Sequence, residues 1–229
     1  MNNTFTSIVR RLVPAALRRE LRRLYAVSPE SRGTYLRHRV QRLRGLESKN
    51  EPIRRPGTVL FVCHGNIMRS ALAHEILAGK LRGLGEQKMI VMSAGTHATS
   101  GQPADPRMRA AAAALGLSLE SHRASLVSES MITLADVIFA MDYLNEAELL
   151  TRYPSALPKV RLLGSYSPST VEGEEILDPF TESNDSAGRC ASRIAACIDA
   201  FATDAGIDAN THSQQSAPLP ARINEAVAR

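Results

Sequence analysis

The segment from residue 58 to residue 84 constrains this chain more than any other. It begins with an apolar run over residues 58–62, passes through a short stretch with glycine and asparagine, and enters a run of helical periodicity over residues 70–84. A buried strand that leads through a tight loop into a helix is the opening unit of an α/β domain. The sequence therefore predicts an α/β fold whose first loop spans residues 63–69.

The residue types in this loop favour the binding of phosphate. Backbone N–H groups of a tight loop at a helix N-terminus point inward, and the helix dipole adds to their field, so the loop attracts a tetrahedral dianion. Gly65 and Asn66 tolerate the positive φ that such a turn requires. Arg69 offers paired donors to two phosphate oxygens, and the same field stabilises a thiolate at Cys63. The predicted phosphate ligands are Arg69 and the loop residues His64, Gly65, Asn66, Ile67 and Met68.

The spacing of Cys63 and Arg69 is weak evidence by itself. The chain contains 24 arginines, so an arginine six residues after a cysteine arises readily by chance. Cys63 could then be an inert thiol buried at the end of a strand. The apolar strand, the Gly-Asn pair, Ser70 and the helix that follows together favour the phosphate site.

Strands and helices alternate along the rest of the chain. We predict strands over residues 89–93, 135–140 and 159–163, and helices over residues 105–115, 144–151 and 186–205. Strands separated by helical crossovers form a parallel sheet that is covered on both faces. The expected organisation is an extension and linker over residues 1–56, a domain over residues 57–207 and a polar tail over residues 208–229.

Several motifs of this domain resemble the low-molecular-weight protein tyrosine phosphatases. The signature Val-Leu-Phe-Val-Cys-His-Gly-Asn-Ile-Met-Arg-Ser lies at residues 59–70. Further matches follow in the family's order at residues 93–96, 103–107, 122–124, 135–142 and 178–180. The resemblance implies a four-stranded parallel sheet of strand order 2-1-3-4, with helices on both faces and the phosphate loop after the first strand.

The resemblance also implies roles for individual residues. Cys63 would attack the phosphorus atom while Arg69 holds the phosphate, and Asp178 would protonate the leaving oxygen and later activate water against the phosphocysteine. This hydrolysis of phosphotyrosine in a protein substrate needs neither a metal ion nor a cofactor. A hydrogen-bond network that shapes the loop would comprise Asn66, Ser70, Ser93 and His122.

Four positions depart from the family pattern or select among its members. His64 stands where the family usually has an apolar residue, although the loop uses only its backbone N–H group. Met68 replaces a second loop cysteine, which removes a partner for a protective disulfide. Thr181 stands where many relatives carry an aromatic residue that grips a phenyl ring. Relatives that hydrolyse phosphoarginine carry threonine in place of Ile67, so this position favours phosphotyrosine.

Two other functions compete with phosphotyrosine hydrolysis for a chain with this loop. Thioredoxin-linked arsenate reductases share the fold and the loop, but they need resolving cysteines in the middle of the chain, and none lies between Cys63 and Cys190. A phosphate-binding regulatory module without activity would have lost the nucleophile or the acid, and both are present.

The extension carries the positive charge of the chain. Residues 1–55 hold 14 Lys/Arg against 4 Asp/Glu, whereas the other residues hold 14 against 19. Apolar residues recur at helical spacing over residues 5–25, with an interruption near Pro14, and a second basic helix is predicted over residues 34–46. We expect an electrostatic tether that binds an anionic membrane surface. An acidic partner, an acidic polymer and a targeting peptide are the alternatives.

Composition sets the expected location and partners. The three cysteines show no C-x-x-C or metal-type spacing, which favours a reducing compartment such as the cytoplasm. The basic extension favours a position at the periphery of a membrane. Tryptophan is absent and aromatic residues are 4%, so we expect no nucleic-acid partner. Bacterial members of the resembled family often act opposite tyrosine kinases that control surface polysaccharide export, which implies a phosphotyrosine protein, such as a tyrosine kinase, as the partner.

Overall fold

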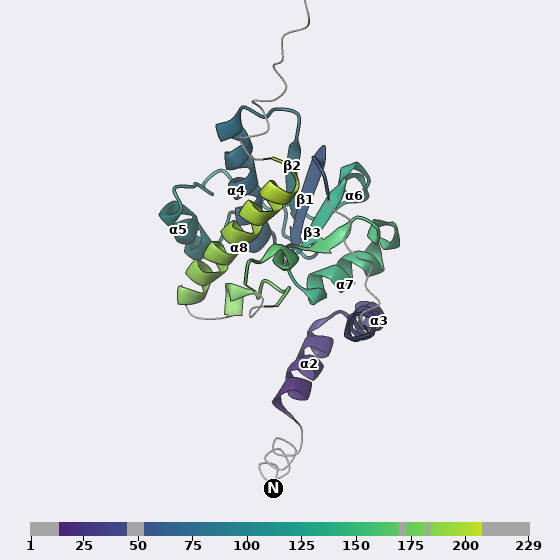
Figure 1. Ribbon diagram of the computed structural model, residues 1–229. Helices are drawn as coiled ribbons and strands as arrows, with labels where there is room; N and C mark the ends of the chain where they lie inside the picture. Colours follow the sequence, from purple (N-terminus) through teal and green to yellow (C-terminus); the bar gives the residue numbers. More distant parts are fainter. Residues whose placement is uncertain (1–13, 45–52, 170–172, 182–183, 208–229) are drawn as a thin grey trace, which may run out of the picture.

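A computed structural model describes residues 14–44, 53–169, 173–181 and 184–207 (Figure 1). Its centre is a four-stranded sheet of order β2-β1-β3-β4 in which all neighbouring strands are parallel. The predicted fold class and strand order are therefore confirmed. The strands are β1 (Thr58–Cys63), β2 (Ile90–Gly95), β3 (Val137–Ala140) and β4 (Val160–Leu162).

The helices of the domain begin and end where local chemistry predicts. Asp105, Ser128 and Asp142 each cap a helix by accepting a hydrogen bond from a backbone N–H group of the first turn, and Gly85 ends one in the left-handed conformation. The short helix α6 was not predicted, because one and a half turns leave too little periodicity to detect. The helices are α4 (Arg69–Leu84), α5 (Pro106–Ala114), α6 (Glu129–Leu134), α7 (Tyr143–Arg152) and α8 (Asn184–Asp204), with 3-10 turns η2 (Pro154–Ala156), η3 (Leu163–Tyr166) and η4 (Pro179–Thr181).

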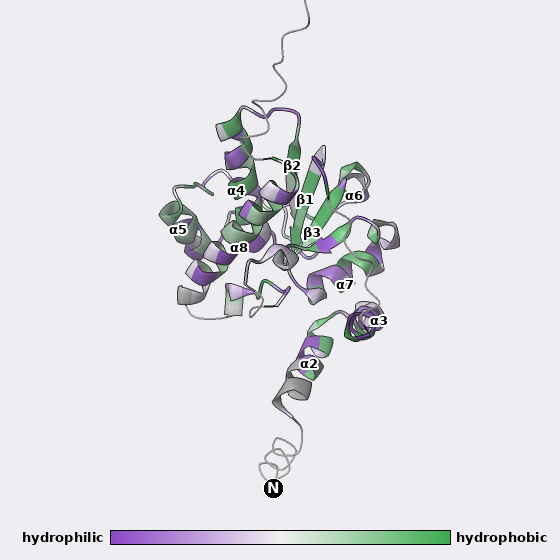
Figure 2. Ribbon diagram, viewed as in Figure 1, coloured by the Kyte–Doolittle hydropathy of each residue, from purple (hydrophilic) through white to green (hydrophobic). Residues whose placement is uncertain are grey.

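The sheet separates two apolar layers. Val59 and Phe61 of β1 pack with residues of α4, α5 and α8, whereas Leu60 and Val62 pack with residues of α6 and α7 on the other face. This alternation follows from the two-residue period of a strand. Figure 1 shows the two groups of helices on opposite sides of the sheet, and Figure 2 shows the apolar character of β1 and β3 between them. The expectation of a buried first strand is met, since all six residues of β1 are buried.

The basic extension is partly folded onto the domain. Helices α2 (Ala15–Ala26) and α3 (Arg32–Leu43), joined by the 3-10 turn η1 (Pro29–Ser31), are called the arm below. Val27 and Tyr35 of the arm are 1% and 2% exposed and pack against Ala147 of α7. The arm is thus attached to α7 by a small apolar core.

Helix α2 begins directly after Pro14, where the interruption was expected. The predictions for residues 1–13, for the linker over residues 45–52 and for the tail over residues 208–229 lie outside the described residues. Within the described ranges, none of the helices is both long and apolar enough to cross a bilayer.

Candidate active site

Cys63 ends β1 and faces into the first turn of the following loop. The backbone N–H of Asn66 donates to the Cys63 sulfur over 3.3 Å, and the hydroxyl of Ser70 lies 2.9 Å from the same sulfur. Asn66 has φ of 53°, the left-handed value that the sequence predicts for this turn. The loop backbone and the first turn of α4 thus both contact the sulfur.

Asn66 is the centre of the network that holds the loop. Its side-chain amide donates to Ser70 over 2.9 Å, and its side-chain oxygen accepts from the backbone N–H of Ser125 over 2.8 Å. The ring Nε2 of His122 lies 2.7 Å from the backbone oxygen of Asn66. The structure thus brings Ser70 and His122 to the loop as predicted. Ser93 differs, because no hydrogen bond from its side chain to the loop is found among the described residues. The backbone oxygen of Ala94 accepts from Ser70 instead.

Gly95 allows the loop to approach β2. A Cβ atom at this position would lie 2.5 Å from the backbone oxygen of His64 and 2.9 Å from the backbone nitrogen of Asn66. Neither contact is sterically permitted, so only glycine fits between the strand and the loop. The sequence showed Gly95 within a family motif, but the reason for glycine becomes visible only when the two segments are brought together.

Arg69 is buried and held by two acidic residues. One guanidinium nitrogen, Nη1, donates to Asp142 over 2.5 Å and to the backbone oxygen of Ile176 over 2.9 Å, while Nη2 lies 2.9 Å from Asp178. Burial by itself would lower the pKa of Arg69, but Asp142 and Asp178 outweigh it and raise that pKa. The arginine therefore keeps its charge inside the protein.

Asp178 lies at the open side of Arg69. Its side chain is 41% exposed, and one of its oxygens accepts from the backbone N–H of Phe180 over 3.1 Å. Phe180 is itself exposed, and the Arg107 guanidinium lies 5.5 Å from its ring centre. Asp178 is thus brought next to the phosphate loop across 115 positions of sequence, with an aromatic ring beside it.

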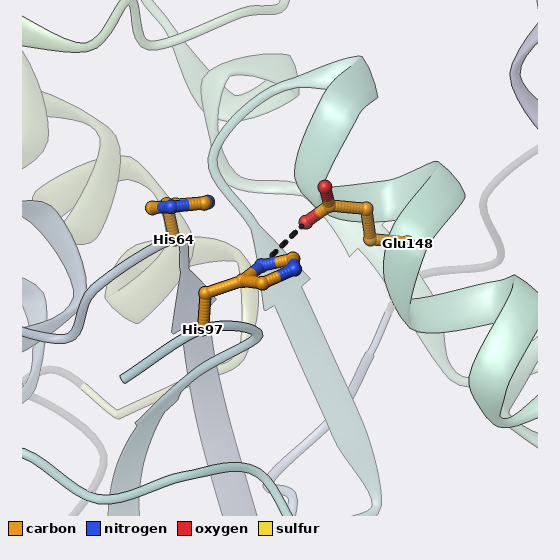
Figure 3. A group of neighbouring side chains, drawn as sticks. All are labelled: His64, His97 and Glu148. Atoms are coloured by element: carbon orange, nitrogen blue, oxygen red, sulfur yellow. Dashed lines mark ion pairs between the residues drawn. The ribbon is translucent and has the colours of Figure 1, made fainter. Parts of the chain in front are cut away.

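His64 points away from the loop toward a second histidine. Its ring stacks on that of His97 with centres 4.6 Å apart, and His97 Nδ1 lies 3.2 Å from Glu148 Oε2 (Figure 3). The backbone oxygen of His64 accepts from the N–H of His97, which ties the two segments together. The expectation that the side chain of His64 takes no part in the loop agrees with this orientation.

Sequence reasoning missed the groups that hold the segment before Asp178, here called the acid loop (residues 173–178). Arg23 of the arm forms an ion pair of 2.6 Å with Glu175, and Arg42 pairs with Glu174 at 3.2 Å. Burial raises the pKa of Glu175, and the nearby Arg23 offsets only part of this effect. The high density of arginines in the extension was visible, but their partners were not.

Two other cysteines lie in α8. Cys190 and Cys197 are buried within the larger apolar core. Burial raises the pKa of Cys190 to about 12, so this thiol stays protonated and unreactive.

A buried arginine beside a cysteine in an anion-binding loop, at the carboxyl edge of a parallel sheet, is the arrangement of a cysteine-dependent phosphatase. The sequence profile described as "Low molecular weight phosphotyrosine protein phosphatase" matches residues 58–213. The chain therefore belongs to this family and to the phosphoric monoester hydrolases.

Individual relatives agree with this assignment. "Probable low molecular weight protein-tyrosine-phosphatase EpsP" of Ralstonia nicotianae is 37% identical over 123 residues, which cover 54% of this chain and 78% of that protein. A protein tyrosine phosphatase from Entamoeba histolytica has a similar structure, with a TM-score of 0.59, 28% identity and coverage of 66% of this chain and 97% of its own. YwlE arginine phosphatase from Geobacillus stearothermophilus shares the fold, with a TM-score of 0.60, 24% identity and coverage of 71% and 100%.

Proposed function

We propose that this phosphatase hydrolyses phosphotyrosine in proteins, with Cys63 as nucleophile, Arg69 as phosphate ligand and Asp178 as general acid and base. The single observation that carries the proposal is the convergence of these three side chains at one loop. Arg69 lies 2.9 Å from Asp178, and the backbone N–H of Asn66 donates to the Cys63 sulfur.

Each group has a defined part in the reaction. The Cys63 thiolate attacks the phosphorus atom, and the loop N–H groups and Arg69 stabilise the charge on the three equatorial oxygens. Asp178 gives its proton to the leaving phenolic oxygen. The same carboxylate then takes a proton from the water that attacks the phosphocysteine, which releases inorganic phosphate and restores the thiolate.

Two apolar residues near the catalytic groups support an aromatic substrate. Phe180, two residues after Asp178, presents an exposed ring that can contact a phenyl ring, and Ile67 packs against the apolar core at the loop. Both features support an aromatic phosphoester. A phosphorylated protein of a tyrosine kinase system is the proposed partner, in line with the tyrosine phosphatase names of the relatives.

The test is to trap the covalent intermediate. Wild-type protein is mixed with a ³²P-labelled phosphotyrosine peptide and quenched in alkali, in which a phosphocysteine is stable, and we expect protein-bound label that is absent from Cys63→Ala. Phosphoarginine and phosphoserine peptides serve as comparison substrates. Label on Cys63→Ala, or faster turnover of phosphoarginine than of phosphotyrosine, would contradict the proposal.

We further propose that the arm attaches the enzyme to an anionic membrane surface. Part of the arm faces solvent, and it combines cationic side chains with apolar ones. Arg37 and Arg44 are exposed, as are the apolar residues Leu21, Tyr25, Leu36, Val40 and Leu43. Leu36, Val40 and Leu43 share one face of α3 because they follow at helical spacing.

Co-sedimentation with phosphatidylserine vesicles tests this attachment. We expect full-length protein to sediment at low salt and to dissociate as salt rises, because screening weakens the attraction. The double variant Leu36→Gln/Val40→Gln should bind more weakly, since shallow apolar burial is lost. Absence of sedimentation at low salt would mean that the exposed side of the arm binds something else.

A further inference from the structure

The rim of the phosphate loop carries a group of metal-binding side chains. His64 follows β1, His97 follows β2 and Glu148 lies on α7, and their ligand atoms all lie within 4.8 Å of one another (Figure 3). His97 Nδ1 and Glu148 Oε2 are 3.2 Å apart. Two ligands bound to one zinc ion at about 2.0–2.2 Å in tetrahedral geometry are separated by about that distance.

Of these three side chains, Glu148 is held in place, whereas His64 has to rotate before it can bind the same ion. Glu148 is buried and its Oε2 accepts from the Thr96 hydroxyl over 2.8 Å, so this ligand is oriented by an outer partner. The rings of His64 and His97 are 21° from parallel, so His64 must turn before both can point at one ion. Its side chain is exposed, and no hydrogen bond to another described residue holds it in the present orientation.

We propose that His64, His97 and Glu148 form a zinc site beside the phosphate loop. Two imidazoles and one carboxylate are a ligand set that zinc accepts, with one position left for water. The ion would neutralise the buried charge of Glu148. It would also hold the side chain of the first loop residue at the entrance of the active site.

Calorimetry with zinc chloride and full-length Cys63→Ser protein tests the site without competition from the catalytic thiolate. We expect one zinc ion per chain, removable by EDTA. His97→Ala and Glu148→Gln should each weaken binding by at least about tenfold, since even the loss of an outer partner costs about 10 to 100-fold. Gln at position 148 can still accept from Thr96, which keeps the fold, and His38→Ala is the matched control outside the group.

Equal zinc affinity in Cys63→Ser, its His97→Ala derivative and its Glu148→Gln derivative would overturn the proposal. Absence of a binding heat in Cys63→Ser would do the same. A loss of affinity in the His38→Ala control equal to that in His97→Ala would place the zinc elsewhere.

A second and independent observation concerns the arm and the two segments that hold Arg69. Arg23 pairs with one oxygen of Glu175, and the other oxygen accepts from the backbone N–H of Tyr143 over 3.2 Å. Arg42 pairs with Glu174 and with Glu146. The arm therefore clamps the acid loop to the start of α7.

Two arginines of the arm lie near the ring of Tyr143. The guanidinium carbons of Arg39 and Arg42 are 4.6 Å and 4.5 Å from its centre, close enough for cation–π attraction. The hydroxyl of Tyr143 also donates to Glu174 over 3.4 Å. These contacts hold the residue directly after Asp142.

The clamped residues are neighbours of the groups that support Arg69. Tyr143 follows Asp142, and Glu175 precedes Ile176, and both Asp142 and the Ile176 oxygen accept from Arg69 Nη1. Asp178 lies three residues after Glu175. A shift of the acid loop would therefore move the support of Arg69 and the proposed acid together.

The geometry points to the arm as a positioning element for catalysis, with Arg23 as its key residue. The side chains of Arg23 and Glu175 are only 20% and 13% exposed, so loss of Arg23 leaves a poorly solvated carboxylate that pulls the acid loop toward water. The inference rests on the proposed role of Asp178. It gives the arm a role in catalysis besides the proposed membrane attachment.

The test compares two aryl phosphates. Arg23→Gln should lower kcat on phenyl phosphate by roughly tenfold and lower it less on p-nitrophenyl phosphate, because misplacement of the acid matters most for a poor leaving group. Arg23→Lys should restore part of the rate. Arg22→Gln is the matched control, since Arg22 is exposed and adjacent on α2.

Equal kcat values for Arg23→Gln and Arg22→Gln on phenyl phosphate would overturn the positioning role, and so would equal losses on both substrates. If Arg23→Gln fails to fold, Glu175→Gln is measured in its place. The variant Asp178→Ala separates the two proposals. If its loss of kcat is the same on phenyl phosphate and on p-nitrophenyl phosphate, the proposed role of Asp178 is wrong. If its loss is larger on phenyl phosphate and that of Arg23→Gln is not, only the proposed role of the arm is wrong.

Discussion

Arg69 and Asp142 form a 2.5 Å hydrogen-bonded ion pair inside the domain although 73 positions separate them in the sequence. Asp142 also accepts from the backbone N–H of Asn145 over 2.7 Å and so caps α7. One carboxylate therefore orients the phosphate-binding arginine and fixes the start of a helix. This double use leaves Nη2 of Arg69 turned toward Asp178 at the open side.

Arg69→Lys should reduce kcat by at least about 10², because an ammonium group cannot donate to two phosphate oxygens in one plane. Lysine also cannot reach Asp142 and Ile176 with the same fork of donors. Steady-state hydrolysis of p-nitrophenyl phosphate gives the rate, and urea unfolding checks the fold. A variant with more than half of the wild-type kcat would show that the guanidinium is not needed.

Asp178→Ala should lower the rate on a phosphotyrosine peptide by roughly 10² to 10⁴, since proton donation to the leaving oxygen is lost. The loss should be smaller on an aryl phosphate whose leaving group departs readily without a proton. The measurement is kcat of wild type and of Asp178→Ala on both substrates. Equal losses on both would identify Asp178 as a structural residue.

Gly95→Ala should destabilise the domain by about 1–3 kcal/mol and lower activity, because the added methyl group collides with the loop backbone at His64 and Asn66. Gly83→Ala is the matched control: it lies in α4, and an added Cβ meets nothing within 4 Å. That substitution should stabilise by up to about 1 kcal/mol through helix propensity. Urea unfolding gives the free energy of unfolding of both variants. Equal changes in the two variants would contradict the steric argument.

Asp105 should make stability depend on pH. Hydrogen bonds from Arg107 lower the pKa of Asp105, so the folded state favours its charged form. This stabilisation is fully present above the unfolded value of about 3.9 and is lost as pH falls through the lower, folded value. Asp105→Asn keeps an oxygen for the helix cap but removes the charge. Its deficit in unfolding free energy relative to wild type should therefore be largest at pH 6 and shrink below about pH 4. A deficit that stays constant with pH would contradict the linkage.

The fold class and most elements of the domain were predicted from local signals, namely apolar runs of strand length and helical periodicity between them. The strand order was implied only by the resemblance at residues 59–70 and the motifs that follow. The proposed nucleophile and arginine were also predictable, because both lie within one loop whose chemistry is written in consecutive residues. Asp178 was found only through the resemblance, since an Asp-Pro pair carries no local signal.

Only the tertiary structure decided which distant groups meet. The pairing of Asp142 with Arg69, the need for Gly95 and the approach of His97 to His64 depend on the ends of three parallel strands lying at one edge of the sheet. The arm shows the same limit. Its positive charge was visible in the sequence, but charge alone does not say whether an arginine binds an anionic membrane or an acidic residue of the same chain. Both attract arginine by the same Coulomb force, and only the fold brings Glu175 within 2.6 Å of Arg23.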